Sequence, residues 1–292
     1  MRESSMMTPR RQTCTSTGGL RKRRLGRTGL FVSEVGVGGA NLTADDAGEE
    51  ALLTAFSLGV SFVETGRLYR GSEYLIGGAL AQAPTQSEVH VASKTLARSR
   101  DGALSDLERS LQHLRLQAID IYQLNSVGRE DWPQVTSEDG ALQGLQEARR
   151  QGMVRFIGIS SHSLRVLRLA IESDEFDTVQ VKWGAFHPES AALIDLACSR
   201  DIGVIGMKPF GGLGMFGSLK GSEFEKTLTA KELLRYALAN PHLSVCIPGV
   251  RRPAEVRENV NTAASCAPLT STVEVEIGEH AKDFLASMRP QA

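Results

Sequence analysis

The segment that decides the fold is "VSFVETGRLYRGSEYLIGGALAQ", residues 60–82. Its apolar start, VSFVE, is typical of a buried strand. Its second half, GSEYLIGGALAQ, is typical of a helix, and Ser72 is a candidate N-cap because a serine hydroxyl can accept a bond from an unpaired helical N–H. The segment therefore predicts one strand followed by one helix.

The same alternation runs along the chain. We expect eight strands, at residues 33–39, 60–64, 88–94, 118–124, 154–160, 178–183, 203–209 and 243–249. We expect the helices that follow them at residues 44–59, 71–82, 101–116, 138–152, 163–173, 189–201, 229–240 and 252–264, and a last helix at 275–289. Before them, two short strands around residues 26–29 predict a hairpin.

Eight strand–helix units predict parallel strands joined by right-handed crossovers. About 250 residues is the usual size of a closed (β/α)8 TIM barrel. We therefore expect an α/β barrel with an N-terminal β-hairpin and a C-terminal extra helix. A doubly wound open sheet is the alternative, but it places its glycine-rich loop after the first strand. The GxGxxG at residues 212–217 follows the seventh strand, so we interpret it as a chance match to that fingerprint.

The composition is that of a globular protein: 292 residues, 41% hydrophobic, with a net charge of −1. We expect a disordered leader at residues 1–20, with a transit peptide as the alternative, and one barrel domain at residues 21–292. Charge and hydropathy predict no nucleic-acid binding and no membrane span. The four cysteines form no CxxC pair or zinc spacing, so we expect reduced thiols, no metal and a cytoplasmic protein.

In a barrel, chemistry lies at the carboxyl ends of the strands, which here carry Glu64, Tyr69, Lys94 and Asn125. A lysine that ends an apolar strand needs a partner, and Glu64 on the neighbouring strand is the expected one. The pair either closes the barrel structurally or favours the phenolate of Tyr69, lowering its pKa and preparing it as a general acid–base. Arg67 is either exposed or a contact for an acidic substrate.

Several motifs follow one another between about residues 25 and 259: "LGRTGLFVSEVGVGG", "GVSFVETGRLYRGSEYLIGGAL", "VASKT", "LERSLQHLRLQAIDIYQL", "GMVRFIGISSHS" and "IPGVRRPAEVREN". In sequence and order they resemble the aldo-keto reductase superfamily. The resemblance implies NAD(P)H-dependent reduction of a carbonyl at the barrel mouth, without metal or flavin.

The family's catalytic tetrad is Asp, Tyr, Lys and His. The resemblance implies that Tyr69 is the proton donor and Lys94 its electrostatic activator. Glu64 stands in the Asp position with one more methylene, and Asn125 stands in the His position. Because an amide does not titrate near neutral pH, we expect a pH–rate profile without a histidine limb.

The resemblance also implies a cofactor site. The nicotinamide positions are Ser160, Ser161, Gln180 and Met207, the pyrophosphate positions are Lys208, Pro209, Phe210, Gly211, Gly212 and Gly214, and the adenosine positions are Gly249, Arg251, Arg252, Glu258 and Asn259. The two arginines favour a 2′-phosphate and hence NADPH, with NADH as the alternative. Glu255, where a phosphate-binding arginine is common in the family, weakens that preference.

Three functions remain open. The first is reduction of a small-molecule aldehyde or ketone, with Asn125 donating an N–H to the carbonyl oxygen and with Arg67 and Trp183 at the substrate. The second is reduction of an unsaturated or unusual secondary-metabolite substrate, because a smaller neutral side chain changes the pocket. The third is a non-catalytic NADPH-binding module, against which the retained Tyr69 and Lys94 argue. We expect a monomer or weak homo-oligomer.

Overall fold

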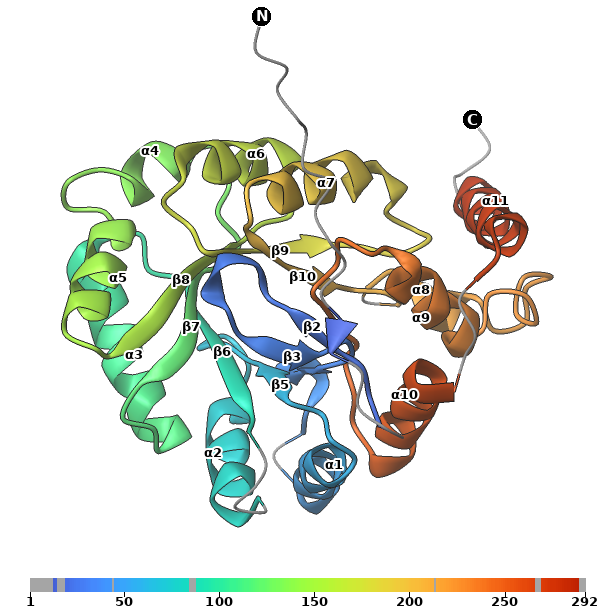
Figure 1. Ribbon diagram of the computed structural model, residues 1–292, viewed down its shortest axis with the longest axis horizontal. Coiled ribbons are helices and arrows are strands. Elements are labelled where there is room, and N and C mark those ends of the chain that lie inside the picture. The colour runs from blue at the N-terminus through green and yellow to red at the C-terminus, as the bar shows by residue number, and fades with distance from the viewer. Residues whose placement is uncertain are drawn as a thin grey trace, which may run out of the picture.

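The computed structural model describes residues 13–14, 19–43, 45–83, 88–212, 214–265 and 269–288. Eight parallel strands form one sheet in the order of the chain (Figure 1). They are β4 (Val37–Gly38), β5 (Phe62–Glu64), β6 (His90–Thr95), β7 (Ile119–Leu124), β8 (Val154–Ser160), β9 (Thr178–Lys182), β10 (Gly203–Met207) and β11 (Val245–Ile247). The predicted (β/α)8 barrel is confirmed.

The sheet closes where the chain before and within β4 meets the last strand. The N–H of Gly36 donates to the carbonyl of Cys246 (2.8 Å), and the N–H of Gly38 donates to the carbonyl of Pro248 (2.9 Å). A Cβ on Gly38 would lie 3.0 Å from the carbonyl oxygen of Ile247, so the missing side chain lets the two edges approach. Closure brings the carboxyl ends of all the strands around one mouth.

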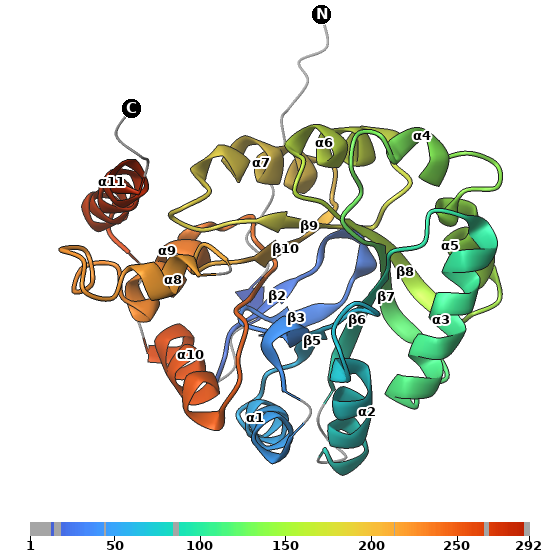
Figure 2. The same ribbon diagram turned by 180° about the vertical axis from the view of Figure 1, so that it is seen from behind.

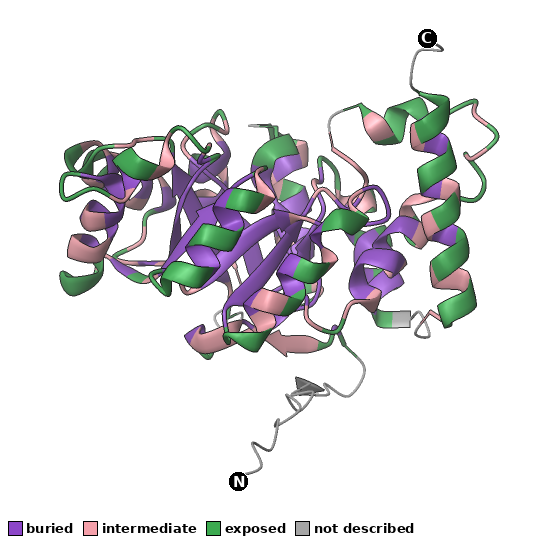
Figure 3. Cartoon of the chain, turned by 90° about the horizontal axis from the view of Figure 1, so that it is seen from above, coloured by how far each residue is buried: buried purple, intermediate pink, exposed green. Residues whose placement is uncertain are grey.

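A ring of helices surrounds the strands, as Figure 2 shows from the other side. The ring consists of α1 (Asp46–Ser57), α2 (Ser72–Gln82), α3 (Arg100–Leu114), α5 (Ala141–Arg150), α6 (Leu164–Ser173), α7 (Ala191–Ser199), α9 (Ala230–Ala239) and α10 (Pro253–Ser265). The shorter α4 (Trp132–Val135) and α8 (Met215–Ser218) lie in loops, and the extra helix α11 (Ser271–Ser287) packs against α9. The strands are buried and the helices expose their outer faces (Figure 3), as amphipathic helices should.

The start of α2 differs from the prediction. Gly71, not Ser72, is the N-cap residue, and it has a left-handed backbone with φ of 74°. A glycine adopts this conformation without the steric cost that a Cβ brings. The hydroxyl of Ser72, now the first helical residue, accepts a hydrogen bond from Thr65 Oγ1 at 2.9 Å. That bond links the helix to the end of β5.

The N-terminal hairpin covers the end of the barrel at which the strands begin. Its strands are β2 (Lys22–Arg24) and β3 (Phe31–Ser33), joined through the 3-10 turn η1 (Gly26–Thr28), as predicted. Leu25, Leu30 and Val32 pack into the lower end of the barrel interior, in one cluster with side chains of the strands. The mouth at the opposite end is therefore where polar strand ends can meet a ligand.

Most of the predicted disordered leader lies outside the described residues. Within it, β1 (Thr13–Cys14) pairs antiparallel with β2. Across the described residues, no helix combines the length and apolar character needed to cross a membrane.

Candidate active site

Glu64, Lys94 and Tyr69 meet at the carboxyl ends of β5 and β6. The two strands are neighbours, with Glu64 in register with Ala92, so Lys94 lies two residues further along the adjacent strand. The Lys94 ammonium donates to Glu64 Oε1 and, at 3.2 Å, to the Tyr69 hydroxyl. Glu64 and Lys94 are 2% and 1% exposed, so this ion pair is buried. The structure brings together these three predicted residues.

The protonation of the cluster differs from the prediction. One of the two alternatives for the pair was that Lys94 lowers the pKa of Tyr69, but the pKa of Tyr69 is raised above its usual value of 10. The first cause is the negative charge of Glu64 and the second is burial, both of which disfavour a phenolate. Burial also lowers the pKa of Lys94, an effect that exceeds the opposing attraction of Glu64. The phenol therefore keeps its proton at neutral pH and can donate it.

Gln180 lies on the opposite wall of the barrel and contacts Glu64. Its amide nitrogen donates to Glu64 Oε1 at 2.8 Å and lies 3.7 Å from the sulfur of Met207. Its amide oxygen accepts from Gln123 Nε2 at 2.8 Å. The resemblance implied that Gln180 binds the nicotinamide amide, whereas in the structure both ends of its amide are bonded within the protein.

Asn125 follows β7 and is fixed at the barrel mouth. Its backbone N–H donates to Thr95 O at 2.9 Å, and its carbonyl accepts from Arg98 at 3.0 Å. Its side-chain oxygen accepts from the hydroxyl of Ser126 at 3.3 Å. Among the described residues nothing accepts a hydrogen bond from its amide nitrogen, so this donor is available to a ligand. Arg98, itself held by Asp131 at 2.9 Å, was not predicted from the sequence.

A cationic region lies at the ends of β8, β9 and β10. Lys208 follows β10, and its ammonium lies 3.1 Å from Nε2 of His162. Lys182, in register with Met207, is close enough to help lower the pKa of Lys208. Burial and these lysines lower the pKa of His162 to about 4. In the part of the chain that the structure describes, neither lysine has a carboxylate partner, so this donor set fits an anionic group such as a cofactor pyrophosphate.

The other predicted nicotinamide and pyrophosphate positions surround this region. Ser160 ends β8 and is buried, and the hydroxyl of Ser161 donates to Val127 O at 2.7 Å. Pro209 is buried and Phe210 packs 5.5 Å from Phe216, centroid to centroid. The backbones of Gly211, Gly212 and Gly214 have positive φ angles of 85°, 98° and 79°. A side chain at these three positions would be strained, so the loop needs glycine.

The predicted adenosine positions lie at the start of α10. Arg251 and Arg252 are exposed, and both contact Glu255: the backbone N–H of Arg251 at 2.7 Å and the guanidinium of Arg252 at 3.3 Å. Glu258 is exposed and Asn259 is buried. Gly249 faces Asn41, whose amide nitrogen would lie 2.5 Å from an added Cβ. Of the two predicted phosphate-binding guanidinium groups, that of Arg252 is therefore already paired with the carboxylate of Glu255.

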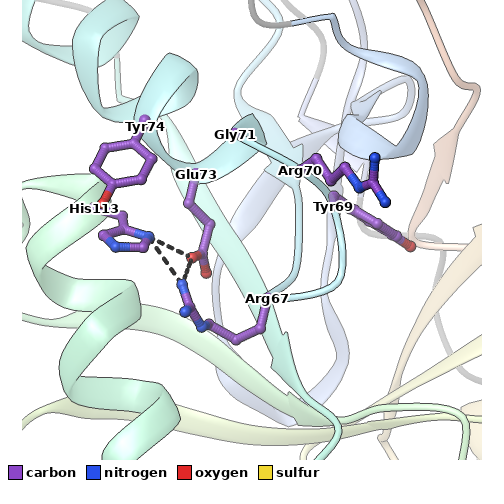
Figure 4. A pocket seen from close by; sticks show the side chains of 7 residues that line it. All are labelled: Arg67, Tyr69, Arg70, Gly71, Glu73, Tyr74 and His113. Carbon is purple, nitrogen blue, oxygen red and sulfur yellow. Dashed lines mark hydrogen bonds and ion pairs between the residues drawn. The ribbon is translucent and has the colours of Figure 1, made fainter.

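Arg67 is engaged away from the Tyr69 hydroxyl. Its guanidinium contacts Glu73 Oε2 at 2.7 Å and His113 Nδ1 at 2.9 Å. In Figure 4 the Arg67 side chain points toward this pair, while Tyr69 points the other way. These residues lie around a small cavity of about 130 Å³. Of the two alternatives for Arg67, full exposure is not observed: its side chain is 20% exposed because it pairs with Glu73, which is buried at the start of α2.

Trp183, the second predicted substrate contact, is also engaged elsewhere. Its indole N–H donates to the carbonyl of Ala237 in α9 at 2.9 Å, and its ring lies 6.1 Å from that of Tyr236. It is 5% exposed. The structure therefore places it in the packing between β9 and α9.

Comparisons with known proteins agree with this geometry. The sequence model described as the Aldo/keto reductase family matches residues 34–233. The chain is 26% identical to an L-galactose dehydrogenase of Arabidopsis thaliana, covering 82% of this chain and 86% of the relative. It is 25% identical to an uncharacterized oxidoreductase of Bacillus subtilis, covering 90% and 97%.

A solved structure shows the same fold. The holo form of an aldo-keto reductase from Bacillus halodurans superposes with a TM-score of 0.75 at 21% identity, covering 91% of this chain and 96% of that one. The matched family model and the barrel agree with the resemblance seen in the sequence. The chain accordingly belongs to the aldo/keto reductase family and is an NAD(P)H-dependent oxidoreductase.

Proposed function

We propose that this enzyme reduces the carbonyl group of a small aldehyde or ketone to an alcohol, with Tyr69 as the proton donor. The observation that carries the proposal is the buried contact of the Tyr69 hydroxyl with the Lys94 ammonium at 3.2 Å. A bound nicotinamide cofactor supplies the hydride. Tyr69 gives its proton to the oxygen on which negative charge develops, and Lys94 stabilises the phenolate that remains.

Asn125 contributes a second donor to the same oxygen. Its side-chain oxygen is occupied by Ser126, which leaves the amide N–H groups for a ligand. Such a donor, fixed before the reaction, stabilises the charge that develops in the transition state. In this role the amide takes the place of the family's histidine and requires no change of its own protonation.

The cofactor we propose is NADPH. Lys208 supplies a cation for the pyrophosphate, Ser160 and Met207 lie at the proposed nicotinamide end, and Arg251 carries no ion pair with a carboxylate among the described residues. Since Glu255 already pairs with Arg252, we expect the preference for the 2′-phosphate to depend mainly on Arg251. Binding of NADPH at least tenfold tighter than NADH, lost in Arg251→Ala, would support this assignment.

Turnover of a carbonyl panel tests the reaction. We expect NADPH oxidation with at least one aldehyde or ketone, and a loss of at least a hundredfold in Tyr69→Phe because general acid catalysis typically contributes about 10²–10⁴-fold. Tyr74→Phe is the matched control, since Tyr74 is an exposed tyrosine of α2. Deuterated NADPH and an unsaturated ketone locate the transferred atom. Deuterium on the former carbonyl carbon supports the proposal, whereas deuterium on the former alkene carbon supports double-bond reduction.

A further inference from the structure

The carboxylate of Glu64 joins two walls of the barrel. Oε1 accepts from Lys94 on the adjacent strand β6 and from Gln180 on β9, and three strands separate β5 from β9 in the sheet. The Glu64 side chain therefore crosses the barrel interior to reach Gln180. Both donors bond the same oxygen, so the position of that oxygen depends on both.

Gln180 is itself fixed by a second glutamine. Gln123 on β7 donates to Gln180 Oε1 at 2.8 Å, and the two side chains are 0% and 2% exposed. Between them, on β8, Gly158 is in register with Gln123 and Thr178. A Cβ on Gly158 would lie 2.9 Å from Cγ of Gln123 and 2.4 Å from Oγ1 of Thr178. The glycine thus leaves the space that the glutamine pair occupies.

We propose that Gln180, supported by Gln123, is a positioning residue for the proton donor, acting through Glu64 and Lys94 on Tyr69. Gln180 holds the carboxylate, the carboxylate holds the ammonium, and the ammonium meets the phenol at 3.2 Å. Glutamate suits this arrangement because its extra methylene, relative to aspartate, extends the carboxylate toward the opposite wall. The inference rests on the proposed function and assigns Gln180 to the acid rather than to the nicotinamide amide.

Two backgrounds separate these roles of Gln180. In Glu64→Asp the carboxylate retreats by one methylene from β9, so Gln180 can no longer hold it and its removal should cost little. If Gln180 instead contacts the nucleotide, replacing Gln180 should cost the same with Glu64 as with Asp at position 64, because the nucleotide is the same in both enzymes. The double-mutant cycle isolates this pairwise term.

The kinetic experiment uses Gln180→Met, which keeps the length of the side chain and removes its hydrogen bonds. A hydrogen bond to a charged group changes an equilibrium constant by roughly tenfold or more. We therefore expect kcat at saturating NADPH to fall about tenfold. We expect the Kd of NADPH, measured by fluorescence, to change less than threefold, and the loss in kcat to shrink below twofold in the Glu64→Asp background. Gln151→Met is the control, since Gln151 donates to Glu147 at 2.7 Å on the surface.

Other outcomes would overturn the proposal. A tenfold rise in the Kd of NADPH with kcat retained would make Gln180 a nucleotide contact, and equal losses in both backgrounds would remove its link to Glu64. If Gln180→Met does not fold, Gln123→Met replaces it in the same comparison, because Gln123 donates the hydrogen bond that holds Gln180. For this variant we expect a loss in kcat of about threefold.

A measurement without substrate separates this inference from the proposed function. If the wild-type enzyme turns over no carbonyl, the proposed function fails, but urea unfolding still tests the contact. In the cycle of Glu64→Asp and Gln180→Met, we expect the unfolding equilibrium constant to show a coupling of about tenfold. A coupling below twofold would overturn the positioning role whatever the enzyme reduces.

Discussion

The buried pair of Glu64 and Lys94 is expected to cost stability when either half is removed and to cost little when both are replaced. In Lys94→Met, Glu64 keeps only the N–H of Gln180 as a described partner. In Glu64→Gln, the ammonium loses the carboxylate charge beside it and keeps only neutral oxygens, the Tyr69 hydroxyl at 3.2 Å and the new amide, with a more distant attraction to Glu73. Because the side chains of Glu64 and Lys94 are 2% and 1% exposed, water cannot take the place of the missing partner.

The magnitude follows from this burial. Leaving one charge of a buried pair unpaired costs about 3–5 kcal/mol, whereas replacing both charges by neutral groups of similar volume is often neutral or stabilising. We therefore expect each single variant to lose about 3–5 kcal/mol, and Glu64→Gln/Lys94→Met to lie within about 2 kcal/mol of the wild type. All three variants should lose carbonyl reduction, because Tyr69 no longer meets an ammonium held by a carboxylate.

Equilibrium unfolding in urea at pH 7, followed by tryptophan fluorescence, measures these values. The matched control is the surface pair of Arg24 and Asp201, whose side chains are 35% and 53% exposed. There we expect single variants to lose only about 0–1 kcal/mol. If the double variant lost the sum of the two single losses, the two charges would not depend on each other, and the reasoning that each buried charge compensates the other would be refuted.

Three further predictions use other parts of the structure. Asn125→Leu should lower kcat/KM for carbonyl reduction by about 10²–10³-fold, the typical effect of removing one such donor, without changing the Kd of NADPH; a loss under threefold would contradict the role of the amide. Glu34→Gln should lower the free energy of unfolding by about 3–5 kcal/mol, because the fully buried Glu34 pairs with Arg23 at 2.8 Å; a urea midpoint equal to that of the wild type would contradict it. Burial raises the pKa of the Cys246 thiol to about 12, so the stability it contributes is complete below pH 9 and declines as the pH rises from 9 towards 12, by at most about 1.4 kcal/mol per pH unit. Unfolding curves at pH 8 and 10 should show a smaller decline for Cys246→Ala than for the wild type, and equal declines would exclude the thiol as the cause.

The barrel and the meeting of Glu64, Lys94 and Tyr69 were predictable from the sequence for one reason. Strands of a parallel barrel end at the same mouth, so residues at successive strand ends must come close whatever their other contacts. The alternation of strands and helices therefore fixed both the architecture and the neighbourhood of the proton donor. The same argument placed Asn125 at the mouth, one strand further on.

Side-chain partners across the barrel were not predictable in this way. The bond between Gln180 and Glu64 depends on how far a glutamate reaches across the interior, and the sequence carries no measure of that distance. Arg67 turned away from Tyr69 because Glu73 is buried at the start of α2, which depends on how that helix packs. The alternative in which Lys94 lowers the pKa of Tyr69 has the wrong sign because the charge of Glu64 and burial both raise that pKa, and the sequence gives neither the position of the carboxylate nor the burial of the phenol.

The proton on Tyr69 leads to a last prediction, about the pH at which each direction of the reaction runs. Carbonyl reduction consumes a proton, so the ratio of kcat/KM for reduction to that for oxidation must fall tenfold per pH unit. The pKa of Tyr69 decides which direction shows this dependence. Because Glu64 and burial raise that pKa above 10, Tyr69 stays protonated and Asn125 does not titrate.

Reduction should then be independent of pH between about 6 and 9, and alcohol oxidation should rise about tenfold per pH unit over the same range. Initial rates in both directions, each at low substrate concentration, measure the two profiles. A reduction rate that falls above pH 7 while oxidation levels off would mean that Tyr69 titrates near neutral pH. Lys94 would then outweigh Glu64, as the sequence alone had suggested, and the buried carboxylate would have another role.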